Sequence, residues 1–64
     1  MTGKELVKRL KKNGWNLDRV HGSHHIMEKN GIMVSVPVHS GKDLKPGTLN
    51  GLLKKTGLSQ EVGE

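Results

Sequence analysis

The sequence contains no cysteine and almost no aromatic residues. Without cysteine, the chain has no disulfide framework, no thiolate nucleophile and no zinc–thiolate cluster. Trp15 is the only residue among Phe, Trp and Tyr, so the chain cannot build the stacking platforms with which RRM and OB-fold proteins bind single strands. It also lacks the roughly 20-residue apolar run that crosses a bilayer and the apolar core of a signal peptide. We therefore expect a cytoplasmic protein without membrane association.

The chain is short and strongly basic. Its 64 residues include 11 Lys and Arg against 6 Asp and Glu, which gives a net charge of +5. A chain of about 60 residues buries only about 60% of its unfolded surface, so we expect one domain with a thin core and no deep substrate pocket. The charge favours a polyanion such as RNA as the partner. Such binding would depend on backbone phosphates, ribose hydroxyls and shape.

Two segments near the ends of the chain are predicted to be helices. Thr2 and Glu5 form a capping-box pattern, and the first helix should end at residues 13–14, Asn-Gly. Pro46 suits the first turn of the second helix, and Gly57 suits its end. The apolar positions recur at helical spacing, which predicts that they face the core: Leu6, Val7, Leu10, Leu49, Leu52 and Leu53.

Three strands are predicted between these helices, over residues 15–20, 24–29 and 32–38. Gly22-Ser23 forms the first turn. Asn30-Gly31 is the strongest short hairpin signal, because a type I′ turn needs positive φ at both central positions. The predicted fold class is therefore α+β, in the order α-β-β-β-α, with a three-stranded antiparallel sheet and two helices on one face. We expect a single domain over residues 1–64, frayed at its last residues, 59–64.

The register of the second hairpin decides which histidine faces the core. A two-residue Asn30-Gly31 loop pairs His25 with Val36, which turns His25 towards the valine face and His24 towards the opposite face. A three-residue loop that starts at Lys29 reverses both orientations. The sequence leaves both registers open, since a shift of one residue turns every side chain over.

Three of the four histidines, His21, His24 and His25, lie around the Gly22-Ser23 turn. Histidine transfers protons near neutral pH, because the ordinary pKa of its side chain is about 6.5. Support for a metal site is weak, since neighbouring strand residues point to opposite faces and no Cys or paired acid completes a tetrahedral set. We expect no metal and no cofactor. The chemistry that remains is metal-free RNA cleavage, in which the ribose 2′-hydroxyl is the nucleophile and histidine moves protons.

The turn belongs to a series of motifs that resembles the HicA toxin family. Gly22-Ser23-His24-His25 looks like the glycine-serine-histidine signature of that family. Gly14-Trp15 and residues 36–39, 44–49 and 54–58 accompany it in the right order, and the similarity covers roughly residues 4–58. The resemblance implies a ribosome-independent mRNA interferase of a type II toxin–antitoxin pair. It also implies a double-stranded-RNA-binding-domain-like fold and a HicB-type antitoxin that covers the active surface.

The resemblance also implies a catalytic histidine on the second strand and no metal. It assigns this role to His24, the residue after Gly22-Ser23, while some family members carry the histidine one position later, at His25 in this sequence. Both therefore remain candidates. We add Lys29, Lys42 and Lys45 as candidate RNA-phosphate contacts, from their places near the hairpin end and in the loop before the second helix.

Two other classes of function fit parts of the sequence. A non-catalytic double-stranded-RNA-binding module would bind A-form backbone and leave the histidines without a role. A pure interaction domain would bind an acidic partner protein through its sheet edge, and would also leave the histidine cluster unexplained. RNA binding without cleavage would identify the first class. A tight protein complex without RNA affinity would identify the second.

Overall fold

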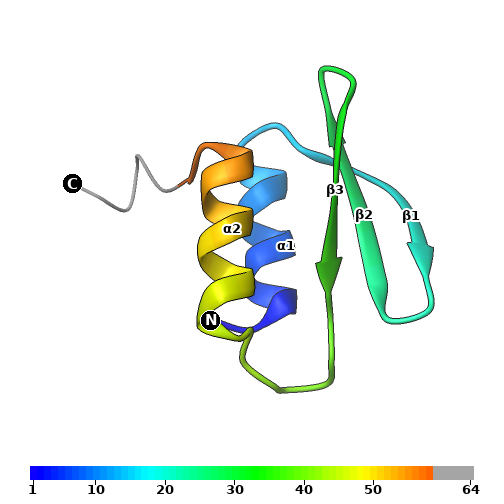
Figure 1. The fold of residues 1–64 in the computed structure, drawn as a ribbon. Coiled ribbons are helices and arrows are strands. Elements are labelled where there is room, and N and C mark those ends of the chain that lie inside the picture. Colours follow the sequence, from blue (N-terminus) through cyan, green and yellow to red (C-terminus); the bar gives the residue numbers. More distant parts are fainter. Residues whose placement is uncertain (59–64) are drawn as a thin grey trace.

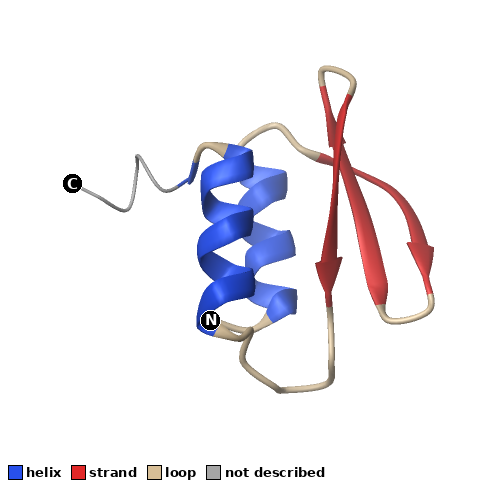
Figure 2. Cartoon of the chain, in the orientation of Figure 1, coloured by secondary structure: helices blue, strands red, loops and turns tan. Residues whose placement is uncertain are grey.

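The structure, a computed structural model, describes residues 1–58 as two helices and one three-stranded sheet (Figure 1). In chain order the elements are α1 (Gly3–Lys12), β1 (Asn16–His21), β2 (His24–Lys29), β3 (Ile32–Pro37) and α2 (Pro46–Thr56). Figure 2 shows both helices on one side of the sheet. The predicted α+β fold, α-β-β-β-α with an antiparallel sheet in the order β1-β2-β3, is therefore confirmed. The last residues, 59–64, which were expected to fray, lie outside the described part.

Helix α1 starts with the predicted capping box. The Thr2 hydroxyl accepts a hydrogen bond from the Glu5 amide at 3.1 Å, and the Glu5 carboxylate accepts one from the Thr2 amide at 2.8 Å. Hydrogen bonding to Thr2 lowers the pKa of Glu5 from its ordinary 4.5. The bond from the Thr2 backbone has the largest effect, and the bond with the Thr2 side chain the next largest. The ionised Glu5 carboxylate of the capping box therefore stabilises the fold fully above pH 4.5. This stabilisation is lost as the pH falls through the lowered pKa.

Helix α2 has the predicted start and end. Pro46 occupies its first turn, and Gly57 follows it with a φ of 81°, the left-handed conformation that favours glycine at this position. Leu52 is buried, and Leu49 and Leu53 pack against the core from its margin. Within residues 1–58, neither helix is long and apolar enough to cross a membrane.

The Asn30-Gly31 turn sets the register between β2 and β3. Asn30 and Gly31 have φ values of 52° and 82°, which suit the type I′ turn that the sequence predicts. His25 pairs with Val36. Of the two registers that the sequence left open, the structure therefore adopts the one with a two-residue loop. In this register Met27, with none of its side chain exposed, is the β2 residue that fills the core.

Three strand boundaries differ from the predicted ones. β1 ends at His21, one residue later than predicted. The other two differ because backbone groups have other partners. β1 begins one residue later than predicted, since the Trp15 amide donates to the Leu10 carbonyl at 3.0 Å and ties this residue to the end of α1. Trp15 is buried in the core that the helices share with the sheet. β3 ends one residue earlier than predicted, and the amide of Val38 donates to the carbonyl of Ser23 at 2.7 Å.

The core lies where the helices cover β2 and β3. β1 forms the edge of the sheet farthest from the helices (Figure 1), so Leu17 and Val20 remain 39% and 54% exposed. Ile32, beside the hairpin turn, is 52% exposed although it shares a face with the buried valines. The buried hydrophobic residues of the described part are Leu6, Val7, Leu10, Trp15, Met27, Val34, Val36, Leu52 and Leu58.

The first turn of α1 packs directly against the end of β3, which gives a test of the packing. A Cβ added at Gly3 would overlap the carbonyl oxygen of Pro37, whereas one added at Gly51 in α2 meets nothing within 4 Å. We expect Gly3→Ala to lower the free energy of unfolding by about 1–3 kcal/mol through overpacking. Gly51→Ala should raise it by about 0.5–1 kcal/mol through helix propensity. Urea unfolding followed by circular dichroism measures both, and equal stability of the two variants would contradict this contact.

Candidate functional site

The two adjacent histidines of β2 lie on opposite faces of the sheet. His24 is exposed on the face that the helices leave open, while His25 is half-buried on the helix-covered face, between Val20 of β1 and Val36 of β3. This separation follows from the alternation of side chains along a strand once Met27 is placed in the core. Of these two adjacent histidines, only His24 is therefore freely presented to a large ligand.

The open face carries a group of cationic and titratable side chains around the β1–β2 turn. His21, the last residue of β1, is the register partner of His24, the first residue of β2. Arg19 lies opposite Ile26 and so faces the same side. Together with Met33 of β3, the residues Arg19, His21 and Ile26 line a shallow hollow of about 320 Å³. An anionic ligand in this hollow would meet Arg19 and His21.

The turn that presents His24 is held in place by its backbone. Gly22 has a φ of 64°, which glycine adopts without the strain that a side chain would bring. The hydrogen bond from the Val38 amide to the Ser23 carbonyl connects the turn to the chain just after β3. Ser23 therefore serves the turn through its carbonyl, in agreement with its reading as a turn residue.

The half-buried His25 has a polar atom without a partner. Among the described residues, no group bonds to its Nδ1, which is inaccessible to solvent. A buried unpaired nitrogen costs about 1–3 kcal/mol. His25 therefore contributes to packing at a cost in stability, on the face opposite to His24.

Two of the predicted phosphate contacts lie at the same end of the molecule as His24. The β1–β2 turn, the end of β3 and the start of α2 are gathered at this end (Figure 1). Pro37 pairs with His24 and lines a second hollow, which the exposed Lys42 and Lys45 also line. His39, Thr48 and the carboxylate of Asp43 complete its polar lining, and this carboxylate lies 3.4 Å from the N-terminal ammonium of Met1. Lys42 and Lys45 thus share a hollow with Pro37, the register partner of His24.

Lys29 is placed differently. It lies at the other end of β2 from His24, about 17 Å away along a strand that rises roughly 3.3 Å per residue. Its ammonium donates to the Asn13 carbonyl at 2.9 Å and is partly buried there. Lys29 therefore closes the end of α1, where a cation also complements the helix dipole.

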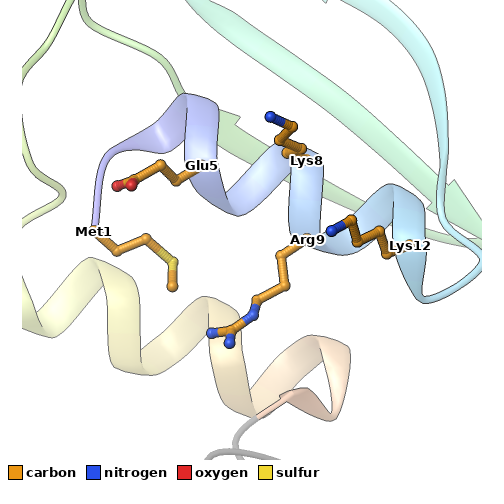
Figure 3. A pocket seen from close by; sticks show the side chains of 5 residues that line it. All are labelled: Met1, Glu5, Lys8, Arg9 and Lys12. Atoms are coloured by element: carbon orange, nitrogen blue, oxygen red, sulfur yellow. The ribbon is translucent and has the colours of Figure 1, made fainter.

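A third hollow, of about 550 Å³, runs beside α1 and away from His24. Figure 3 shows its lining side chains, with Met1 and Arg9 extending towards α2. Lys8 and Lys12 add positive charge, and Glu5 adds a carboxylate at the opposite end. This hollow is larger than the one at His21, but no histidine lines it.

Sequence reasoning missed part of this arrangement. Arg19 was not among the candidates, and His21 was noted as part of the histidine cluster without being assigned a catalytic role. A two-residue Gly22-Ser23 turn places its flanking residues opposite each other, so the pairing of His21 with His24 was available from the sequence. Within residues 1–58, no three His, Cys, Asp or Glu side chains gather closely enough to hold a metal ion.

Comparison with known protein families gives a match. The model of a protein family described as the HicA toxin of bacterial toxin–antitoxin systems matches residues 3–58, which is most of the chain. No curated protein matches the chain.

The opposite environments of the two histidines predict opposite effects on stability. His25→Leu should raise the free energy of unfolding by about 1 kcal/mol, because it removes the buried unpaired nitrogen and keeps the side-chain volume. His24→Ala, at an exposed position, should change it by less than about 0.5 kcal/mol. Urea unfolding at pH 7 measures both. A clear loss of stability in His25→Leu would show that the nitrogen has a partner.

Proposed function

The chain belongs to the HicA toxin family, and from this membership we propose that it is an mRNA interferase, an endoribonuclease that cleaves mRNA and thereby inhibits translation. The observation that carries this proposal is His24, exposed at a fixed turn on a chain with a net charge of +5. We also propose that residues 1–64 form one toxin domain with a double-stranded-RNA-binding-domain-like fold. The family match over residues 3–58 and the order α-β-β-β-α support this.

RNA brings its own nucleophile, which suits a small protein with an open site. The ribose 2′-hydroxyl attacks the adjacent phosphorus once its proton is removed, and the leaving 5′-oxygen must receive a proton. Each such transfer contributes about 10²- to 10⁴-fold in rate, and nearby cations stabilise the negative charge on the phosphate. The proposed reaction needs neither a metal ion nor a cofactor, and histidine performs the acid–base work.

We assign the catalytic role to His24 and a packing role to His25. His24 can reach a phosphodiester lying on the open face, because nothing covers it among the described residues. His25 points to the helix-covered face between Val20 and Val36, where an RNA backbone has no access to its buried Nδ1.

Lys42 and Lys45 are the proposed phosphate contacts at the same end of the molecule as His24. Both are exposed, and both line the hollow that begins at Pro37, opposite His24. The case for Lys29 as a third contact is weaker, because its ammonium already donates to the Asn13 carbonyl. RNA would then extend from the open face towards the start of α2.

The family implies an antitoxin partner, which we propose to be of the HicB type. A protein that neutralises this toxin in the cytoplasm must compete with RNA for the basic end of the molecule. We therefore expect the antitoxin to place acidic side chains near Lys42 and Lys45 and to cover His24. The positive charge of the chain would speed their association.

Cleavage of a structured mRNA in excess EDTA tests the nuclease proposal. We expect the wild type to cut and His24→Ala to lose at least about 10²-fold in rate, while RNA binding is retained. His25→Leu, which alters the covered face, is the matched control and should cut at the wild-type rate. The 2′-hydroxyl mechanism also predicts new 5′-hydroxyl ends, which polynucleotide kinase labels without prior phosphatase treatment.

The same experiment separates the competing functions. If the wild type binds RNA in a salt-dependent manner but never cuts, with or without added metal, the chain is a non-catalytic double-stranded-RNA-binding module. If activity disappears in His25→Leu and not in His24→Ala, the catalytic role belongs to His25. Either result would overturn the assignment made here.

The proposed phosphate contacts predict the salt dependence of RNA binding. The slope of log K against log salt concentration is negative, and each lost phosphate contact makes it shallower by about 1. The double variant Lys42→Ala/Lys45→Ala should therefore make it shallower by about 2. The control is Lys54→Ala/Lys55→Ala, which removes the same charge from exposed positions in the last turn of α2. Equal slopes for the two double variants would show that only net charge matters.

A further inference from the structure

We propose that His21 is the second proton-transfer group of the RNA cleavage, acting with His24 as an acid–base pair. This inference rests on the proposed function and extends it to a second catalytic residue. It starts from the register of the first hairpin, where His21 of β1 lies directly opposite His24 of β2.

The two imidazoles share a face and a short separation. Residues directly opposite each other in an antiparallel pair have Cβ atoms about 4.5–5.5 Å apart and point to the same side of the sheet. His21 and His24 are both exposed on the open face. This separation allows one phosphodiester to lie over the pair, within hydrogen-bond reach of one imidazole on its 2′-oxygen side and of the other on its leaving-oxygen side.

The two-residue turn sets this pairing, and a β-bulge in β1 lets it coexist with the pairing of Leu17 and Met27. Leu17 lies opposite Met27, but Arg19 lies opposite Ile26, so Asp18 is an extra residue without a partner in the register. If Leu17 stayed opposite Met27 and β1 had no bulge, Arg19 would lie opposite His25 and face the helix-covered side. The bulge therefore turns both Arg19 and His21 to the open face, in the way that bulges redirect side chains next to active sites.

The pair is also held in a fixed position. Only Gly22 and Ser23 separate the two histidines, and the 2.7 Å bond from the Val38 amide to the Ser23 carbonyl fixes the turn against the chain after β3. A fixed turn limits how far the imidazoles can move relative to each other. Such positioning is what lets two groups act on one substrate in the same step.

The charged groups around the pair suit an anionic phosphate. From β1, Arg19 faces the same side, and its Nε lies 3.0 Å from the Asp18 carboxylate, which leaves the other guanidinium N–H groups for a phosphate. On β2, Glu28 shares the face but accepts a bond from the Gly31 amide at the far end. From β3, the residue opposite His24 is Pro37, which does not titrate.

The reaction balances with these two histidines alone. A neutral imidazole takes the proton of the 2′-hydroxyl, the 2′-oxygen–phosphorus bond forms, and the bond from phosphorus to the 5′-oxygen breaks. The protonated imidazole gives its proton to the 5′-oxygen. The products carry a 2′,3′-cyclic phosphate and a 5′-hydroxyl, and proton exchange with water restores the pair.

Single-turnover cleavage in EDTA as a function of pH tests the pair, with wild type, His21→Ala, His24→Ala and His25→Leu. We expect His21→Ala to lower the cleavage rate by about 10²- to 10⁴-fold while its RNA affinity stays within about threefold of the wild type. The wild-type profile should be bell-shaped, since one imidazole must be neutral and the other protonated. His21→Ala should lose one limb of the profile and His24→Ala the other, and urea unfolding checks that both variants are folded.

The outcomes separate this inference from the proposed function. If His21→Ala cuts like the wild type with the same profile, and His24→Ala is inactive, His21 is not catalytic and the nuclease function stands. If His21→Ala loses RNA affinity by the same factor as activity, His21 only contacts RNA and the pair is overturned. If the wild type does not cut at all, the nuclease function itself fails.

Discussion

The alternation of side chains along β2 is the constraint on which the rest of the structure depends. Met27 must face the helices, because a thin core has no other β2 side chain that packs so completely. Its placement sends His24 to the open face and His25 to the covered one. The type I′ turn at Asn30-Gly31 favours the same register, so turn geometry and burial oppose a slip that would exchange the two histidines.

β1 obeys a different rule because it lies at the edge of the sheet. It is too far from the helices to bury Leu17 or Val20 fully, so little hydrophobic energy fixes which way its residues point. This freedom permits the bulge at Asp18, which moves Arg19 and His21 to the open face. The side-chain directions of the edge strand β1 can therefore suit the site, whereas those of β2 and β3 are fixed by burial in the core.

The size and charge of the chain explain why an open site is sufficient. A domain this small cannot enclose a substrate, but an RNA backbone binds to an exposed basic surface through its phosphates. The turn with His24 and the loop with Lys42 and Lys45 lie at the same end of the molecule (Figure 1). Lys29, at the other end, stabilises the junction between α1 and β1 through the Asn13 carbonyl.

The sequence by itself determined the features that depend on neighbouring residues. The capping box at Thr2, the turn at Asn30-Gly31, the order of the elements and most of the core were predicted, because their signals lie within a few residues of one another. Only the tertiary structure decided the register of β2, the bulge at Asp18 in β1, and the partner of Lys29. These features depend on contacts between segments far apart in the chain. The local sequence allows more than one strand register, and burial of side chains against the helices determines which one is stable.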